Sequence, residues 1–130
     1  MIPIIKESDL NTIKWCLSNL AQHHKTKEID QLKLELERAK IVKDDAIDDE
    51  IIQLHSEFTV INQKTGDSLS FSLELPAKAD LKNKSISILS PLGVALIGFK
   101  KGSKVRWTLP GGETELEIIS VVQTAIKHKQ

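Results

Sequence analysis

The sequence predicts an α+β protein in which a short antiparallel helical hairpin precedes a twisted antiparallel sheet covering one short helix. Three observations support this fold class. Apolar residues recur every three or four positions before about residue 50, they alternate with polar residues after it, and one helical pattern interrupts the alternation. We therefore divide the chain into a helical half, residues 1–50, and a sheet half, residues 51–130, and expect each to be a domain.

Two amphipathic segments make up the predicted hairpin. The first begins at Ser8 or Asp9, which are both good N-cap residues, and its apolar face carries Leu10, Ile13, Leu17 and Leu20. The second runs from about Lys27 to Lys43, with apolar residues at positions 29, 32, 36 and 39 in a heptad-like, coiled-coil seam. Because isolated helices this short are marginal in water, they must pack on each other or on the sheet half.

An acidic connector at residues 44–50 ends the helical half. It contains four aspartates and one glutamate, and negative charge at a helix C-terminus opposes the helix dipole. We interpret this cluster as a solvated linker, and the alternative is a surface that meets a basic patch on a partner.

Alternation of apolar and polar residues predicts the strands of the sheet half. The strongest signal lies at residues 68–75, where apolar residues alternate with serine and glutamate until Pro76 ends the strand. Further strands are expected at residues 58–62, 85–88, 105–109 and 114–122, and in the last of these Leu116, Ile118 and Val122 are predicted to share one face. Turns at residues 64–67 and 110–112 separate neighbouring strands.

The helix that interrupts the strands begins at Ser90, a good N-cap, followed by Pro91, which suits the first helical position. Its apolar face carries Leu92, Ala95, Leu96 and Phe99, and Gly102 follows two lysines as a natural stop. The order of elements in the sheet half is therefore β-β-β-α-β-β.

Composition excludes several function classes. Lys plus Arg equals Asp plus Glu at 18 each, so the net charge of zero gives no drive for sequence-specific or general nucleic-acid binding. A single cysteine forms no intramolecular disulfide and no thiolate-rich zinc site. The sequence has no signal-peptide pattern and no apolar run that would span a membrane. We expect a cytoplasmic monomer.

Residues 85–121 resemble the C-terminal domain of the bacterial Gre transcription factors. Those proteins share the pattern I-S-x-x-S-P-x-x-x-A-L-I-G-x-x-x-G-x-x-V-x-x-x-x-P-G-G, which this sequence matches at the same spacing from Ile86 to Gly112. Trp107 and the segment at residues 76–80 look more like the Rnk branch, the regulators of nucleoside diphosphate kinase, and the short hairpin also suits that branch. The resemblance implies an FKBP-like fold for the sheet half.

The resemblance also implies a partner. In the Gre factors this domain sits on the rim of the RNA polymerase secondary channel, the helical hairpin enters the channel, and the start of the Ser-Pro helix forms part of the grip. The candidate polymerase-binding residues here are Leu89, Ser90, Pro91 and Leu92, and we expect both leucines to present apolar surface. Gre factors often carry Asp or Asn at the position of Leu89, so the contact in this chain differs.

No catalytic residue, metal ligand or cofactor is predicted. Gre factors promote transcript cleavage with acidic residues at the hairpin tip that help hold Mg²⁺, whereas the expected tip here is His23-His24-Lys25. Adjacent histidines on a helix point about 100° apart and make a poor chelate. Cys16 is interpreted as a packed thiol with no base within sequence reach, and Trp107 as a core residue.

The sequence is compatible with three functions. We expect a non-enzymatic transcription regulator that binds RNA polymerase near the secondary channel and competes with Gre-type factors. The alternative is an interaction module acting outside transcription, through nucleoside diphosphate kinase. A prolyl isomerase of the FKBP type is the weakest option, because three Phe, two Trp and no Tyr are too few to line its aromatic pocket.

Overall fold

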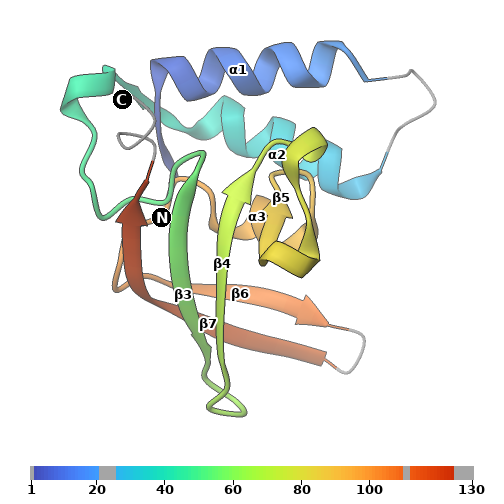
Figure 1. The fold of residues 1–130 in the computed structure, drawn as a ribbon, viewed down its shortest axis with the longest axis vertical. Coiled ribbons are helices and arrows are strands. Elements are labelled where there is room, and N and C mark those ends of the chain that lie inside the picture. The colour runs from blue at the N-terminus through green and yellow to red at the C-terminus, as the bar shows by residue number, and fades with distance from the viewer. Residues whose placement is uncertain (1, 21–25, 110–111, 125–130) are drawn as a thin grey trace.

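The computed structural model describes residues 2–20, 26–109 and 112–124 of the 130-residue chain. Helices lie along one side of a curled five-stranded sheet, and a small two-stranded sheet lies near the N-terminus (Figure 1). The predicted α+β class is confirmed.

The helical half contains α1 (Glu7–Ser18) and α2 (Lys27–Arg38). Each contributes one fully buried side chain, Ile13 and Leu32, to the same core as the sheet. Residues 21–25, which include the predicted tip at His23 and His24, lie outside the described residues, so the hairpin connection remains a prediction.

Two helix boundaries differ from those predicted. Helix α1 begins at Glu7, and its N-cap residue Lys6 makes no side-chain cap, whereas Asp9 is buried and bonds elsewhere. Helix α2 ends at Arg38, because the following residues form strand β2 (Lys40–Val42), which pairs in parallel with β1 (Ile4–Lys6). Isoleucine and valine in β2 favour an extended backbone. The spacing of apolar residues within this segment does not reveal that β1, more than thirty residues earlier, is available as a partner strand.

The sheet half contains β3 (Ser56–Asn62), β4 (Ser68–Glu74), β5 (Ser85–Ser87), α3 (Pro91–Leu96), β6 (Lys104–Leu109) and β7 (Gly112–Gln123). This order confirms the predicted β-β-β-α-β-β succession. The strands lie side by side in the order β5-β4-β3-β7-β6. Helix α3 contacts both β5 and β6, the two edge strands of the sheet.

The sheet is mixed, although a wholly antiparallel sheet was predicted. Strand β5 pairs with β4 in parallel, while the other three pairings are antiparallel. Between β4 and β5 the chain forms two short 3-10 turns, η2 (Pro76–Lys78) and η3 (Leu81–Asn83), which carry it back to the level of Ser72 in β4. A parallel return needs such a crossover, and alternation within a strand does not reveal the strand's direction.

Strand β7 contains a bulge that the sequence prediction did not include. Thr59 pairs with Ser120 while Val60 pairs with Ile118, so Ile119 is an extra residue on β7. Beyond the bulge the faces exchange. Val122 is therefore 48% exposed, and the prediction that it shares the buried face of Leu116 and Ile118 is wrong.

A close contact joins the N-terminal segment to the sheet half. The Ile4 N–H donates to the Gly98 carbonyl at 2.9 Å, and Gly98 has a φ of +86°. A Cβ at this position would lie 2.5 Å from Cβ of Pro3. Only glycine fits there, which gives one glycine of the sequence motif a packing role between the two halves.

Candidate functional site

The start of α3 has the geometry that the sequence predicts. Ser90 is extended and its hydroxyl accepts a hydrogen bond from the Gly93 N–H at 3.0 Å, as an N-cap does. The same hydroxyl donates to the Ser87 carbonyl at 2.7 Å, and Pro91 occupies the first helical position. Ser90 therefore links α3 to the end of β5.

Two further residues hold this helix start in place, Ser87, which is a position of the Gre pattern, and Gly93, which the sequence analysis did not single out. The Ser87 hydroxyl accepts a hydrogen bond from the Leu89 N–H at 2.9 Å. A Cβ on Gly93 would lie 2.3 Å from the Ser87 carbonyl oxygen, so α3 approaches the end of β5 too closely for any other residue. In the sequence, the position of Gly93 two residues after Pro91 was the signal that could have indicated this close approach.

The four predicted docking residues are adjacent in space but differ in exposure. Pro91 is exposed, and Leu89 and Ser90 are half-buried, with the Leu89 side chain packed against the core. Leu92 is only 7% exposed, so the expectation that it presents apolar surface is wrong. The reason is the direction of α3, which turns Leu92 toward the sheet. The surface at this site consists of Pro91 and the accessible parts of Leu89 and Ser90.

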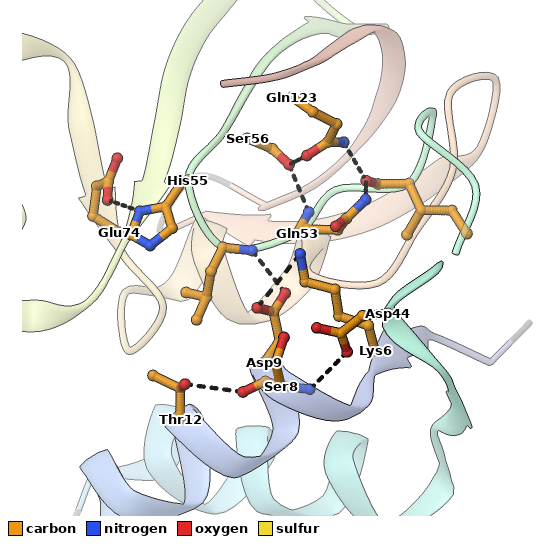
Figure 2. A network of polar contacts seen from close by, with 12 residues as sticks. Lys6, Ser8, Asp9, Thr12, Asp44, Gln53, His55, Ser56, Glu74 and Gln123 are labelled. Carbon is orange, nitrogen blue, oxygen red and sulfur yellow. Dashed lines mark hydrogen bonds and ion pairs between the residues drawn. The ribbon is translucent and has the colours of Figure 1, made fainter. Parts of the chain in front are cut away.

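A network of polar contacts places the helical half on the sheet half (Figure 2). The buried Asp9 carboxylate accepts a hydrogen bond from the Leu54 N–H at 3.1 Å and lies 4.0 Å from the Lys6 ammonium. Burial raises the pKa of Asp9, and Lys6 and the Leu54 N–H lower it in part. Asp9 is thus a tether between α1 and the segment leading into β3, and not a helix cap.

A histidine lies close to this tether. His55 has a φ of +71°, which a residue other than glycine rarely adopts, and its Nδ1 lies 2.7 Å from a Glu74 carboxylate oxygen (Figure 2). The His55 N–H donates to the Leu73 carbonyl at 2.7 Å. The pair fixes the turn before β3, and no sequence pattern indicated it.

The acidic connector is partly bound to the protein itself. The Asp44 carboxylate accepts a hydrogen bond from the Ser8 N–H at 3.0 Å, and this bonding holds the pKa of Asp44 below its ordinary value. Asp48 accepts from the Glu50 N–H and pairs with Lys100 at 3.0 Å, which lowers the pKa of Asp48 in the same way. The connector is more ordered than a freely solvated linker.

The other candidate residues that the structure describes form no metal cluster and hold no activated thiol. Among the described residues, no group of three or more His, Cys, Asp or Glu side chains is placed to hold a metal ion. Burial raises the pKa of the half-buried Cys16 thiol, which disfavours the reactive thiolate. Trp107 packs on the core, but its buried indole N–H has no acceptor within the described part of the chain. No described helix is long and apolar enough to cross a membrane.

Known proteins share this architecture. The regulator of nucleoside diphosphate kinase from Escherichia coli K12 is 31% identical over 93 residues, which cover 71% of this chain and 68% of that protein. The transcription elongation factor GreA from Nitrobacter winogradskyi is 36% identical over 113 residues, covering 81% of this chain and 72% of that protein. The solved structure of a transcription elongation factor GreA/GreB from Nitrosomonas europaea aligns with a TM-score of 0.76 and 26% identity, covering 94% of this chain and 98% of that one.

A family model described as transcription elongation factor, GreA/GreB, C-term, matches residues 47–123. The match extends from the acidic connector to the end of β7 and includes the whole of α3. Since it covers more than half of the chain, and relatives at 31% and 36% identity agree with it, the protein belongs to the GreA/GreB C-terminal family.

Proposed function

We propose that this protein is a transcription regulator that binds RNA polymerase near the secondary channel through the start of α3. The observation that carries the proposal is the helix start at Ser90 and Pro91. It falls at the positions of the Gre pattern, and Pro91 is exposed beside hydrogen bonds that fix the backbone. A rigid, exposed surface loses little conformational freedom on binding, which favours its use as a docking point.

The regulator is proposed to be non-catalytic. The sequence at the expected tip, His23-His24-Lys25, offers no carboxylate for a Mg²⁺ ion, which prefers oxygen ligands. Helices α1 and α2 have 12 residues each, and at about 1.5 Å per residue each arm is roughly 18 Å long. Such a protein would occupy the channel rim and exclude Gre-type factors without assisting cleavage.

A cleavage assay on backtracked elongation complexes tests the non-catalytic part. We expect no stimulation of transcript cleavage by this protein, with a Gre factor as the positive control. Adding this protein to the Gre factor should reduce the cleavage that the Gre factor stimulates, because the two compete for one surface. Robust cleavage by this protein alone would overturn the proposal.

Charge substitution tests the docking surface. Leu89→Asp places an acid where Gre factors often carry one, and it should alter the affinity for core RNA polymerase. Leu81→Asp is the matched control, because Leu81 is 74% exposed on η3, which precedes β5, whereas α3 follows β5. If both variants remain folded and bind polymerase as the unmodified chain does, the start of α3 is not the docking site.

A second candidate function follows from one relative. The Escherichia coli protein at 31% identity is a regulator of nucleoside diphosphate kinase, so an effect on that kinase is the alternative. Affinity purification separates the two functions. Recovery of polymerase subunits supports the first, and recovery of the kinase without polymerase supports the second.

A further inference from the structure

A cleft of about 650 Å³ lies between α2, α3 and β6. One face of α2 forms one wall and β6 forms the other, and both α2 and β6 contact α3. Val94, Phe99 and Val105 are buried beneath it. The cleft thus has an apolar floor between a helix and the edge of a sheet.

The wall formed by β6 is an open strand edge. Strand β6 is last in the sheet order and, within the described ranges, pairs with β7 alone (Figure 1). Apart from that pairing, the backbone of residues 104–108 makes no hydrogen bond with any residue that the structure describes. An edge of this kind is a template for one more strand.

Trp107 gives a second indication that the cleft is incomplete. Its side chain lines the cleft and packs against the core, and its indole N–H is buried without an acceptor among the described residues. A buried donor left unpaired destabilises the protein, so such a group is rare unless something else supplies the acceptor. The nitrogen is covered by protein atoms, so a bound segment would supply the acceptor only with a small movement of the cleft wall.

The charges around the cleft indicate the chemistry of that segment. The cationic side chains lining it are Lys27, Arg38, Lys104 and Arg106, against two carboxylates, Glu28 and Glu35. Glu35 already accepts from Arg38 at 3.1 Å and from Gln31 at 2.8 Å. Lys104 and Arg106 lie opposite Glu117 and Glu115 of β7, and Arg106 lies 4.0 Å from Glu113. Among the side chains that line the cleft itself, cations outnumber carboxylates by four to two, which favours an acidic ligand.

We propose that the cleft binds an acidic, extended protein segment, which adds to the sheet as a strand beside β6. Its backbone would pair with β6, its acidic side chains would meet Lys104 and Arg106, and apolar side chains on its other face would enter the cleft. This docking mode uses β6 and not the grip at Ser90 and Leu89, although Pro91 also lines the cleft.

Two other occupants fit less well. A second copy of this chain, pairing through the same edge, would bring Lys104 and Arg106 next to the same two cations, which is unfavourable across neighbouring strands. A single-stranded nucleic acid would match the cations and the indole. It cannot pair with the backbone edge of β6, which an extended peptide can do.

A synthetic peptide of roughly eight alternating Glu and Val residues, with blocked ends, is a suitable probe for a strand of this length. The chain has two tryptophans, and Trp15 is 67% exposed, so Trp15→Phe leaves Trp107 as the only fluorescent reporter. We expect saturable binding seen by Trp107 fluorescence. In amide NMR spectra, the residues of β6 should shift and exchange more slowly with solvent.

Charge reversal provides the matched comparison. The double variant Lys104→Glu with Arg106→Glu should weaken peptide binding at least about tenfold. Lys78→Glu with Lys82→Glu makes the same change in net charge at exposed sites near the opposite edge of the sheet, and should stay within about twofold of the unmodified chain. Both variants alter exposed side chains, and circular dichroism checks that they fold.

Several results would overturn the proposal. If a peptide of alternating Lys and Val binds as tightly as the Glu and Val peptide, the cleft does not select acidic segments. If the amide shifts lie away from β6, the peptide does not add to the sheet as a strand. Tighter binding of a single-stranded oligonucleotide would assign the cleft to nucleic acid. Concentration-dependent dimerisation, lost in the charge-reversed variant or mapped to β6, would assign the edge to a second copy. Absence of any peptide binding at millimolar concentration would leave the cleft without this function.

Discussion

The helical and sheet halves of the chain are held by different kinds of contact. Among the residues that the structure describes, the core cluster contains seventeen buried side chains, and all but Ile13 and Leu32 come after residue 50. The helical half is attached by those two side chains, by Leu17 and Leu36 packed against the cluster, and by polar and backbone contacts such as Asp9 with the Leu54 N–H. The sheet half therefore carries most of the apolar stabilisation, whereas a small number of specific contacts fix the position of the helices on it.

Removal of the helical half is the strongest test of this comparison. A fragment of residues 51–130 should still unfold cooperatively on heating, because fifteen of the seventeen core residues remain. Loss of Ile13 and Leu32 should lower the free energy of unfolding by about 3–6 kcal/mol, at about 1.5–3 kcal/mol for each buried side chain. Calorimetry of the fragment and the full chain measures the difference. A fragment without a cooperative transition would show that the two halves are one folding unit, against the predicted domain boundary.

A pair of leucines in α2 tests the apolar part of the attachment. Leu32 is fully buried and Leu34 is 56% exposed, two positions further along the same helix. Leu32→Ala should lower the free energy of unfolding by about 2–5 kcal/mol, as large-to-small core substitutions do. Leu34→Ala should change it by no more than about 0.5 kcal/mol. Urea denaturation of both variants measures this, and similar values for the two would contradict the assignment of Leu32 to the shared core.

The two halves also differ in how much of their structure could be predicted from the sequence. In the sheet half, the strands, the Ser90 cap and the position of Pro91 followed from local patterns, because alternation and capping involve residues close together in the chain. The direction of β5 and the bulge at Ile119 did not, since each depends on a partner strand elsewhere in the sequence.

The helical half was predicted less well for the same reason. Strand β2 was taken as the end of a helix, because its partner β1 lies more than thirty residues earlier. Asp9 was interpreted as a cap, whereas its acceptor role depends on Leu54, 45 residues away. In the candidate site, helical periodicity had already placed Leu92 on the apolar face of α3 with Leu96, and both are buried. The expectation that Leu92 presents apolar surface came from the resemblance and not from that pattern.

The Asp9 tether predicts a pH dependence. Burial raises the pKa of Asp9 in the folded protein above its ordinary value, so the folded state holds this proton more tightly than the unfolded state does. Stability from this group is therefore greatest below the ordinary aspartate pKa and falls as the pH rises through the raised folded-state value. Asp9→Asn removes this titration while retaining an oxygen that accepts from Leu54.

The measurement is the free energy of unfolding against pH for the unmodified chain and the variant. Asp9→Asn should equal the unmodified chain at low pH and become the more stable of the two as the pH rises toward neutrality. Asp44→Asn is the control of opposite sign, because the pKa of Asp44 is lowered by Ser8 and its contribution is lost as the pH falls. A destabilised Asp9→Asn variant at neutral pH would show that the Lys6 pairing outweighs the desolvation of the carboxylate.

The smallest expected effect on stability lies at the proposed docking surface. Pro91 is exposed at the first helical position, where an N–H has no partner within the helix, so Pro91→Ala breaks no hydrogen bond. It should lower the free energy of unfolding by no more than about 1 kcal/mol, through the added freedom of the unfolded chain. Pro76→Ala is the matched control, since Pro76 holds the same position in η2. The two variants should therefore have similar stability and differ in polymerase affinity, with only Pro91→Ala binding more weakly. If the two variants bind polymerase equally well, the start of α3 is not the docking site. Its hydrogen bonds would then serve only to hold α3 against the sheet half.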